Sequence, residues 1–454
     1  MRLKLTIVLL VVATVLLYGG IETEAREITV NTTDNLQQIL DKAQDNDEIM
    51  LEPGIYEGNF TINTKVQLIG KKGATLQGSG QGDVLTVNAD EVTIENLQIE
   101  KGGSQNAGIY LKSNRNMIKN NKIYDVFHGI VVRDGYGNVI TENVITSFKH
   151  ASNKGYAIYL IEAPNSRVTT NFTYDTNDGI YISYSNLCEI AYNNIVRARY
   201  GIHTMDSKDV VIAENYISQS RNGLMIMQSY NLQIKKNFLY ENTTITGVGI
   251  FLFDTFNSSI QANVMKKNNK GIFLENAIEN LIEFNQIESN EKGIEIGKNS
   301  NGNQINLNNF IRNNQQVISN EENENEFSWD GYGNYWDNQQ SVNISQTETI
   351  DYAYKSGDVF YHLTMNEAYL QIFTGSPAVR LWNMVEQFVP VVSNKFVVDE
   401  HPLAKPATID IDVVNHHSDK VLKSGISWKP FIIFLCFMIF SIVIFKTARR
   451  ERHE

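Results

Sequence analysis

A repeat of about 22 residues runs through the middle of the chain and limits its fold more than any other feature. A Gly or Ala followed by an aliphatic residue recurs with spacings of 21, 28, 22, 22, 22, 26, 22 and 22 residues. These dipeptides begin at Gly108, Gly129, Ala157, Gly179, Gly201, Gly223, Gly249, Gly271 and Gly293. Self-similarity at this period is typical of solenoids, in which each repeat contacts only its neighbours.

The repeat predicts strands rather than helices. Polar and apolar residues alternate with period 2, as in residues 178–183, and the repeats are rich in β-branched residues. Leucine-rich repeats share the period, but these repeats contain little Leu. We therefore predict an all-β fold, a right-handed parallel β-helix of about ten coils. Aliphatic residues one and three positions after each Gly, such as Ile180 and Ile182, should point inward and contribute roughly 1.5–3 kcal/mol each.

Asparagine is unusually frequent, with 52 residues among 454. One series keeps step with the repeat: Asn121, Asn143, Asn171, Asn193, Asn215, Asn237, Asn263, Asn285 and Asn308. Asn tolerates the left-handed backbone region, and its amide can bond to nearby backbone and to the next stacked amide. We expect this series to mark one turn of every coil. Cys188 should lie in the core, and with only two cysteines no disulfide framework is expected.

Both ends of the chain carry membrane signals. Arg2 and Lys4 precede an apolar run, which predicts a signal peptide over 1–25, with an uncleaved anchor as the alternative. Residues 426–445 predict a transmembrane helix, with a buried core helix as the alternative, and a basic tail follows at 446–454. The chain would then lie on the outer face of the cytoplasmic membrane, with a single-pass C-terminal anchor and the C-terminus in the cytoplasm. The net charge of −12 argues against a nucleic-acid partner.

The segments between these ends divide by pattern. We assign an N-terminal cap and first coil to 26–65, the β-helix to 66–320, a small C-terminal module of helical and irregular structure to 327–406, and a polar spacer to 407–425. The cap is expected to contain a short amphipathic helix over 35–43, because open solenoid ends need covering.

The outward face of the repeat presents soft metal ligands. His203 and Met225 occupy the same register on successive coils, as do Met205 and Met227. Neighbouring strands lie about 4.8 Å apart, so four side chains can converge, and thioether and imidazole groups suit Cu(I). The alternative is that these residues pack under a loop or a partner. Two insertions, at 147–155 (which contains His150) and 241–247, should frame the site from both sides.

Other outward residues favour a different function. Outward Tyr side chains could stack on sugar rings, so a polysaccharide-binding or polysaccharide-modifying surface protein, similar to a lyase or epimerase, is the alternative function. However, the outward registers show no vertical stack of acids of the kind that holds Ca²⁺ in such lyases. Asp175, Asp178 and His128 are interpreted as solvated turn residues. A packing role is the default for His362 and Met365, and the pair at 416–417 is a weak metal candidate.

The C-terminal module carries the most specific sequence signals. Residues 330–337 read Asp-Gly-Tyr-Gly-Asn-Tyr-Trp-Asp, and further motifs follow in order at 351–354, 360–363, 376–382, 386–390 and 399–403. Together with the signal peptide and the repeats, this order resembles the NosD family of nitrous oxide reductase maturation proteins, which have a pectate-lyase-like β-helix.

The resemblance implies a non-enzymatic accessory protein. NosD-type proteins work outside the cytoplasmic membrane with an ABC transporter, formed by a permease and an ATPase, and help to deliver copper to nitrous oxide reductase. A copper chaperone is the expected donor and copper the transient cargo. The C-terminal module 327–406, with its helix-like run 377–389, would be the part that docks on the permease. The C-terminal membrane helix departs from the soluble form of the family and suggests tethering. The four-residue copper site is inferred from register and not from a family motif.

Overall fold

The computed structural model describes residues 25–149, 153–244, 246–319, 324–339, 343–356, 360, 363, 367–373, 376–386 and 397–409. The chain divides into two units, Met1–Ile411 and Asp412–Glu454, and all described residues belong to the first. Apart from residue 25, the predicted signal peptide lies outside the described residues, as do the predicted transmembrane helix and basic tail. No helix within the described ranges is long and apolar enough to span a membrane.

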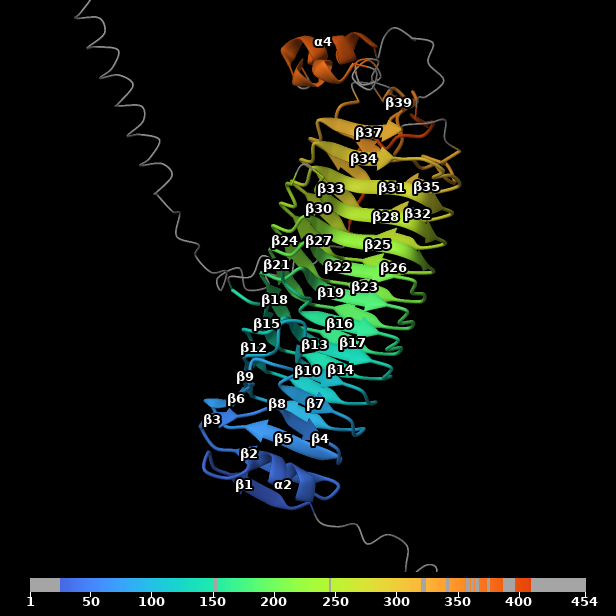
Figure 1. Cartoon of the computed structure of the whole chain (residues 1–454). Coiled ribbons are helices and arrows are strands. Elements are labelled where there is room, and N and C mark those ends of the chain that lie inside the picture. The colour runs from blue at the N-terminus through green and yellow to red at the C-terminus, as the bar shows by residue number, and fades with distance from the viewer. Residues whose placement is uncertain are drawn as a thin grey trace, which may run out of the picture. The chain divides into compact units, whose positions relative to one another are not determined.

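Three parallel sheets, named A, B and C, form a β-helix, and the chain visits them in that order in each coil (Figure 1). Sheet A contains, in spatial order, β1 (Glu27–Val30), β2 (Asp47–Leu51), β5 (Val66–Gly70), β8 (Thr93–Glu95), β11 (Met117–Lys119), β14 (Val139–Thr141), β17 (Arg167–Thr169), β20 (Glu189–Ala191), β23 (Val211–Ala213), β26 (Gln233–Lys235), β29 (Ser259–Gln261), β32 (Leu281–Glu283) and β35 (Gln304–Asn306).

Sheet B contains β3 (Gly54–Glu57), β6 (Ala74–Gln77), β9 (Gln98–Glu100), β12 (Lys122–Ile123), β15 (Val144–Thr146), β18 (Phe172–Tyr174), β21 (Asn194–Val196), β24 (Tyr216–Ser218), β27 (Phe238–Tyr240), β30 (Val264–Lys266), β33 (Gln286–Glu288), β36 (Asn309–Ile311) and β38 (Tyr335–Trp336). Sheet C contains β4 (Phe60–Ile62), β7 (Leu85–Val87), β10 (Ala107–Leu111), β13 (His128–Arg133), β16 (Ile158–Ile161), β19 (Asp178–Ser183), β22 (Tyr200–Met205), β25 (Asn222–Tyr230), β28 (Val248–Phe256), β31 (Lys270–Ile278), β34 (Lys292–Ile296) and β37 (Gln315–Ser319).

The described remainder is short. It comprises the helix α2 (Leu36–Lys42), the 3₁₀ helix η1 (Ala368–Phe373), the helix α4 (Pro377–Glu386) and an antiparallel pair formed by β39 (Tyr354–Ser356) and β40 (Val397–Asp399). The predicted β-helix is therefore confirmed. Among the described residues, sheets A, B and C hold 13, 13 and 12 strands, more than the expected ten coils, because the first and last coils lack the Gly-aliphatic pair by which coils are recognised in the sequence.

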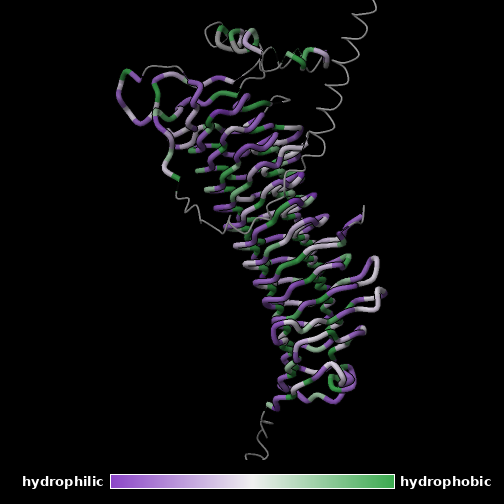
Figure 2. Tube along the Cα trace, turned by 90° about the vertical axis from the view of Figure 1, so that its left-hand side faces the viewer, coloured by the Kyte–Doolittle hydropathy of each residue, from purple (hydrophilic) through white to green (hydrophobic). Residues whose placement is uncertain are grey.

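The core is a column of aliphatic side chains inside the coils. Ile180 and Ile182 of β19 are fully buried, as are Leu224 and Ile226 of β25, so the predicted inward positions are confirmed. Figure 2 shows hydrophobic and hydrophilic stretches alternating along the coils. Cys188 lies in this core, and burial raises the pKa of its thiol to about 11.

A continuous ladder of asparagines runs along one turn. The backbone N–H and the side-chain amide of Asn171 both donate to Oδ1 of Asn193 at 3.0 Å, and Asn193 repeats this pattern on Asn215. The left-handed residue of the turn is not the ladder Asn but the residue before it, for example Thr170 (φ 59°) and Tyr192 (φ 58°). The expectation that Asn serves the left-handed position was therefore wrong, because its amide is needed for the coil-to-coil bonds.

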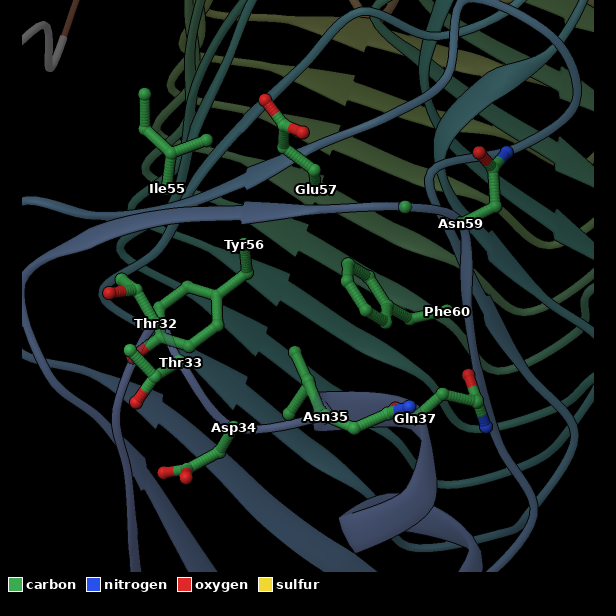
Figure 3. A pocket seen from close by; sticks show the side chains of 12 residues that line it. Thr32, Thr33, Asp34, Asn35, Gln37, Ile55, Tyr56, Glu57, Asn59 and Phe60 are labelled. Carbon is green, nitrogen blue, oxygen red and sulfur yellow. The ribbon is translucent and has the colours of Figure 1, made fainter.

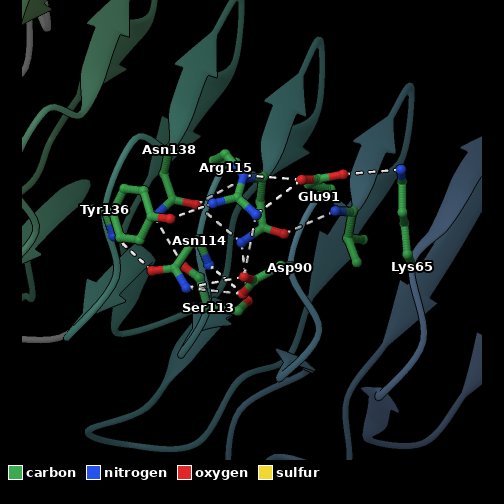
Figure 4. A network of polar contacts seen from close by, with 10 residues as sticks. Lys65, Asp90, Glu91, Ser113, Asn114, Arg115, Tyr136 and Asn138 are labelled. Carbon is green, nitrogen blue, oxygen red and sulfur yellow. Dashed lines mark hydrogen bonds and ion pairs between the residues drawn. The ribbon is translucent and has the colours of Figure 1, made fainter.

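Charged and polar side chains at the exposed turns of successive coils form networks of hydrogen bonds and ion pairs. Figure 4 shows one of them, in which Asp90 accepts from the backbone and the amide of Asn114, while Glu91 faces Lys65 and Arg115. The hydrogen bonds and cations that surround Asp90 and Glu91 lower the pKa of both carboxyls. These exposed pairs fix the turns but contribute little individually.

The first coil is covered by α2, as expected. Asn35 caps this helix by accepting from the backbone N–H of Gln38 at 3.0 Å, and the helix buries its own residues Leu36 and Leu40. The hydroxyl of Tyr56 donates to the carbonyl of Val30 at 2.7 Å and links the cap to the first strands.

The Gly-Asn-Tyr-Trp segment closes the other end. Asn334 accepts from the backbone and amide of Asn308 at 3.0 and 2.9 Å, and thus ends the ladder. Trp336 stacks between Phe310 and Tyr354, with ring centroids 4.2 Å away on each side.

Asp399 of β40 holds this closure together. Its carboxylate accepts from the Trp336 indole at 2.8 Å and from the backbone N–H of Asn334 at 2.7 Å. A Cβ at Gly333 would lie 1.8 Å from its Oδ1, so only glycine fits beside it. Burial raises the pKa of Asp399 to about 6, against the effect of these hydrogen bonds.

Candidate metal centre

The four predicted ligands lie on two neighbouring strands of sheet C, in the register expected. β22 and β25 run parallel, with Cα pairs His203–Met225 and Met205–Met227. Adjacent strands are about 4.8 Å apart and residues two apart along a strand about 6.6 Å. The four Cα atoms therefore form a small rectangle from which the side chains leave on one face.

This face is the outer one. The flanking residues Ile202 and Ile226 belong to the core, whereas His203 and Met225 do not, as strand alternation requires. Both outward residues are nevertheless well covered, with 7% of each exposed. Met205 and Met227 are half-buried. The candidate ligands thus sit in a shielded position outside the solenoid core.

A column of rings covers them. Tyr159 and Tyr181 are stacked at 4.9 Å with nearly parallel planes, and Tyr181 stacks on the imidazole of His203 at 4.3 Å. On the other side, Met225 pairs in register with Phe251, which stacks on Phe273 at 4.6 Å. The imidazole lies only 8° from the plane of Tyr181, so its two nitrogens point sideways from the column.

The two nitrogens of His203 have different surroundings. Nδ1 lies 3.1 Å from Oδ2 of Asp178. The Asp178 side chain is fully buried, and its carboxylate accepts hydrogen bonds from Nε and Nη2 of Arg199 at 2.8 and 2.9 Å. Nε2 is also buried and has no hydrogen-bond partner among the described residues. Because a buried ring nitrogen normally has a partner, Nε2 is a candidate ligand atom.

Asp178 corrects one interpretation. It was expected to be a solvated turn residue, but it is the first residue of β19 and is buried by Arg199 and His203 from the next coil. Asp175 is partly exposed and pairs with Arg197, whose guanidinium lowers its pKa although partial burial opposes this effect.

Two of the three candidate thioethers, those of Met205 and Met225, have a polar contact. The hydroxyl of Tyr181 lies 3.3 Å from Sδ of Met205, and the amide of Asn222 lies 3.7 Å from Sδ of Met225. Sulfur accepts hydrogen bonds weakly, so these contacts orient the thioethers without preventing metal binding. The donor set of one imidazole and three thioethers fits Cu(I), which prefers soft ligands.

The predicted framing insertions are only partly described. His150 and residue 245 lie outside the described residues.

Beside the first insertion, His128 was expected to be solvated, but it packs against Phe127 and Tyr156 and accepts the Tyr156 N–H at 3.0 Å through Nδ1. Burial lowers its pKa to about 4. His362, Met365 and residues 416–417 are also outside the described ranges.

Carboxylates do not stack on this face. In the described coils Glu295 pairs in register with Phe273 and Ser183 with Met205, and Glu295 is neutralised by Lys270 and Lys292 at 3.0 and 2.7 Å. Within the described residues, no three His, Cys, Asp or Glu side chains gather into a metal-binding group. The soft cluster differs from such a group because three of its four members are methionines.

A separate open hollow lies at the N-terminal cap (Figure 3). It has a volume of about 490 Å³ and is lined by residues 32–37 and 55–60, with the rings of Tyr56 and Phe60 beside it. Its lining includes hydroxyl, carboxylate and amide side chains, such as those of Thr33, Asp34 and Asn59. It is formed by other coils than those that carry the candidate ligands.

Two family descriptions match the chain. Residues 146–341 match "Periplasmic copper-binding protein (NosD)", and residues 59–151 match "Right handed beta helix region". The first match covers the coils that carry His203 and its neighbours, together with the Gly-Asn-Tyr-Trp segment.

Two curated relatives carry the same name. "Probable ABC transporter binding protein NosD" of Stutzerimonas stutzeri is 29% identical over 401 residues, which cover 79% of this chain and 87% of the relative. The protein of that name from Pseudomonas aeruginosa is 33% identical over 112 residues, 25% of this chain and 26% of the relative.

Solved structures share the fold. The Dettilon tailspike protein superposes with a TM-score of 0.56 at 15% identity, covering 66% of this chain and 70% of its own. The Family 28 exopolygalacturonase of Yersinia enterocolitica gives 0.54 at 11% identity, covering 67% and 79%. At these identities the likeness concerns the fold alone. The NosD match over the central coils and the relative aligned over most of its length make this chain similar to NosD proteins, and its β-helix agrees with the second family description.

Proposed function

We propose that this chain is a non-enzymatic accessory protein that works with an ABC transporter to deliver copper to nitrous oxide reductase outside the cytoplasmic membrane. The family description names copper binding and the periplasm, and the relatives are named as transporter binding proteins. In this proposal copper is a transient cargo, received from a copper chaperone.

One observation carries the proposal. His203 and Met225 are paired in register on the outer face, and Met205 and Met227 lie beside them. Nε2 of His203 is buried and has no partner in the described part of the chain. Imidazole and thioether groups favour Cu(I) over the hard cations that carboxylates hold. Such a site can bind a soft ion and release it to a stronger acceptor.

The C-terminal module offers a surface suited to docking on the permease. Leu381, Trp382 and Val385 of α4 are all more than half exposed, and they recur at the spacing of one helical face. Exposed apolar side chains also occur in η1, at Tyr369, Ile372 and Phe373. Large exposed apolar patches commonly mark interaction sites. A membrane anchor at 426–445 would keep this module close to the permease.

Deletion of the gene tests the function directly. In the deletant, the secreted nitrous oxide reductase should lack most of its copper by elemental analysis. The wild-type gene should restore the copper content, and a gene with His203, Met205, Met225 and Met227 all changed to Ala should not. A reductase with normal copper content in the deletant would refute the proposed function.

The stacked rings of Tyr159 and Tyr181 favour one alternative, a polysaccharide-binding surface. Parallel aromatic faces can hold sugar rings, although the residues next in register are His203 and Met225 and not acids. Incubation of the purified chain with uronate polymers distinguishes the two functions. Unsaturated products that absorb in the ultraviolet would establish a lyase, whereas the copper proposal predicts none.

A further inference from the structure

We infer that the Asp178–Arg199 pair holds His203 in the tautomer protonated at Nδ1, so that Nε2 is the atom that binds Cu(I). This inference rests on the proposed function and deepens it, because it adds two positioning residues to the copper site. Neither of them is a predicted ligand.

The hydrogen bond between His203 and Asp178 determines the tautomer. A carboxylate accepts hydrogen bonds and does not donate them, so the 3.1 Å contact from Nδ1 to Oδ2 places a proton on Nδ1. In the neutral ring, Nε2 then carries a lone pair. A carboxylate behind a histidine in this way is a common support for metal ligands, because it fixes the ring and makes it more basic.

Arg199 balances the buried charge of Asp178. Its guanidinium makes a bidentate contact with both carboxylate oxygens, at 2.8 and 2.9 Å. Without it, a fully buried carboxylate would be left without a cationic partner, which is costly in the interior. With it, the carboxylate has its cationic partner and is held in one position beside Nδ1 of His203.

Aromatic packing fixes the orientation of the ring. Tyr181 covers one face of His203, and the edge of Tyr200 packs at 5.2 Å in a nearly perpendicular contact. The guanidinium of Arg199 lies 4.3 Å from the centre of the Tyr200 ring, so the same residue supports both Asp178 and the aromatic wall. Nε2 is therefore held in one direction, in the plane of the ring.

The structure supplies a control pair with the same contact geometry, although it is more exposed. Asp175 and Arg197 form a second bidentate pair, with both contacts at 2.8 Å, and like Asp178 and Arg199 they come from successive coils. None of the described contacts of Asp175 reaches His203. Substitution of Asp175 by Asn removes an ion pair of the same kind without touching the candidate ligand.

The test measures tautomer and affinity separately. In the metal-free full-length chain labelled with ¹⁵N-histidine, long-range ¹H–¹⁵N spectra report which nitrogen carries the proton, and His203→Gln assigns the signal. We expect the Nδ1–H form in the wild type and in Asp175→Asn. Asp178→Asn should lose that preference, because an amide can also donate to Nδ1. Competition with a Cu(I) chelator should then show affinity reduced about 10–100-fold in Asp178→Asn and nearly unchanged in Asp175→Asn.

A second variant covers the case in which Asp178→Asn fails to fold. The double substitution Asp178→Asn with Arg199→Gln removes both charges together and leaves none unpaired in the interior. Thermal unfolding first establishes that this double variant is folded. The double variant should then show the same loss of tautomer preference and of Cu(I) affinity as Asp178→Asn. Wild-type tautomer and affinity in the folded Asp178 variants would overturn the inference. Absence of Cu(I) binding by the wild type would instead overturn the proposed function, while the metal-free spectra would still report on the positioning.

Discussion

Substitution of Asn193 by Ala removes one rung from the asparagine ladder. In the wild type, Oδ1 of Asn193 accepts from the backbone N–H and the amide of Asn171, and its own amide donates to Asn215 and to the carbonyl of Val168 at 2.8 Å. All of these groups are buried. After the substitution, the Asn171 N–H has no acceptor and the Val168 carbonyl loses a donor. At roughly 1–3 kcal/mol for each buried group left without a partner, the loss of stability should be about 3–5 kcal/mol.

The effect should also be local. Because each coil contacts only its neighbours, the loss should appear first as faster hydrogen exchange in peptides around residue 171, and then as a lower unfolding temperature. Asn314→Ala is the control, since Asn314 is exposed and its amide donates to the side chain of Glu291, so a change within about 0.5 kcal/mol is expected. Equal unfolding temperatures and equal exchange for the two variants would refute the role assigned to the ladder.

Two further predictions concern close packing and pH. Gly201→Ala should destabilise the chain by about 3 kcal/mol or more in thermal unfolding, because its Cβ would lie 2.4 Å from Ile217 and 2.6 Å from the carbonyl oxygen of Gly223; an unchanged melting temperature would contradict the close approach of these coils. Burial raises the pKa of Asp399 from 3.8 to about 6, so between these values the folded chain binds a proton that the unfolded chain has lost. The contribution of Asp399 to stability should therefore fall as the pH rises from about 4 to 6, by up to about 3 kcal/mol, and Asp399→Asn should remove this component from the pH dependence of unfolding. Identical pH profiles for the two proteins would show that the carboxyl does not titrate in this way.

The repeat explains why so much of the fold could be predicted. Nine of the coils carry the same Gly-aliphatic or Ala-aliphatic strand and the same Asn. The nine copies therefore predict one local structure, and the inward positions follow from strand alternation. The first and last coils were undercounted because they lack these marks. The left-handed residues were assigned wrongly, since Thr170 and Tyr192 adopt this conformation although their side chains do not favour it. There the coil-to-coil bonds outweigh residue preference.

The candidate site was predicted only in part. The register of His203 and Met225 follows from repeat spacing, and so it could be read from the sequence. The support from Asp178 and Arg199 could not, because it depends on side-chain direction across two coils. A usable signal existed nonetheless: Arg199 directly precedes Tyr200, the register partner of Asp178. An acid and a base one residue out of register on successive coils can be sought in any chain of this type.

Cu(I) affinity of the purified chain tests the central claim most directly. The test variant should combine His203→Phe with Met205→Leu, Met225→Leu and Met227→Leu, so that packing volume is largely kept. The control for loss of a thioether is Met117→Leu, because Met117 is an exposed residue of sheet A. Competition with a Cu(I) chelator should give one bound ion for the wild type and for the control, and none for the fourfold variant. Full copper binding by the folded fourfold variant would contradict the account.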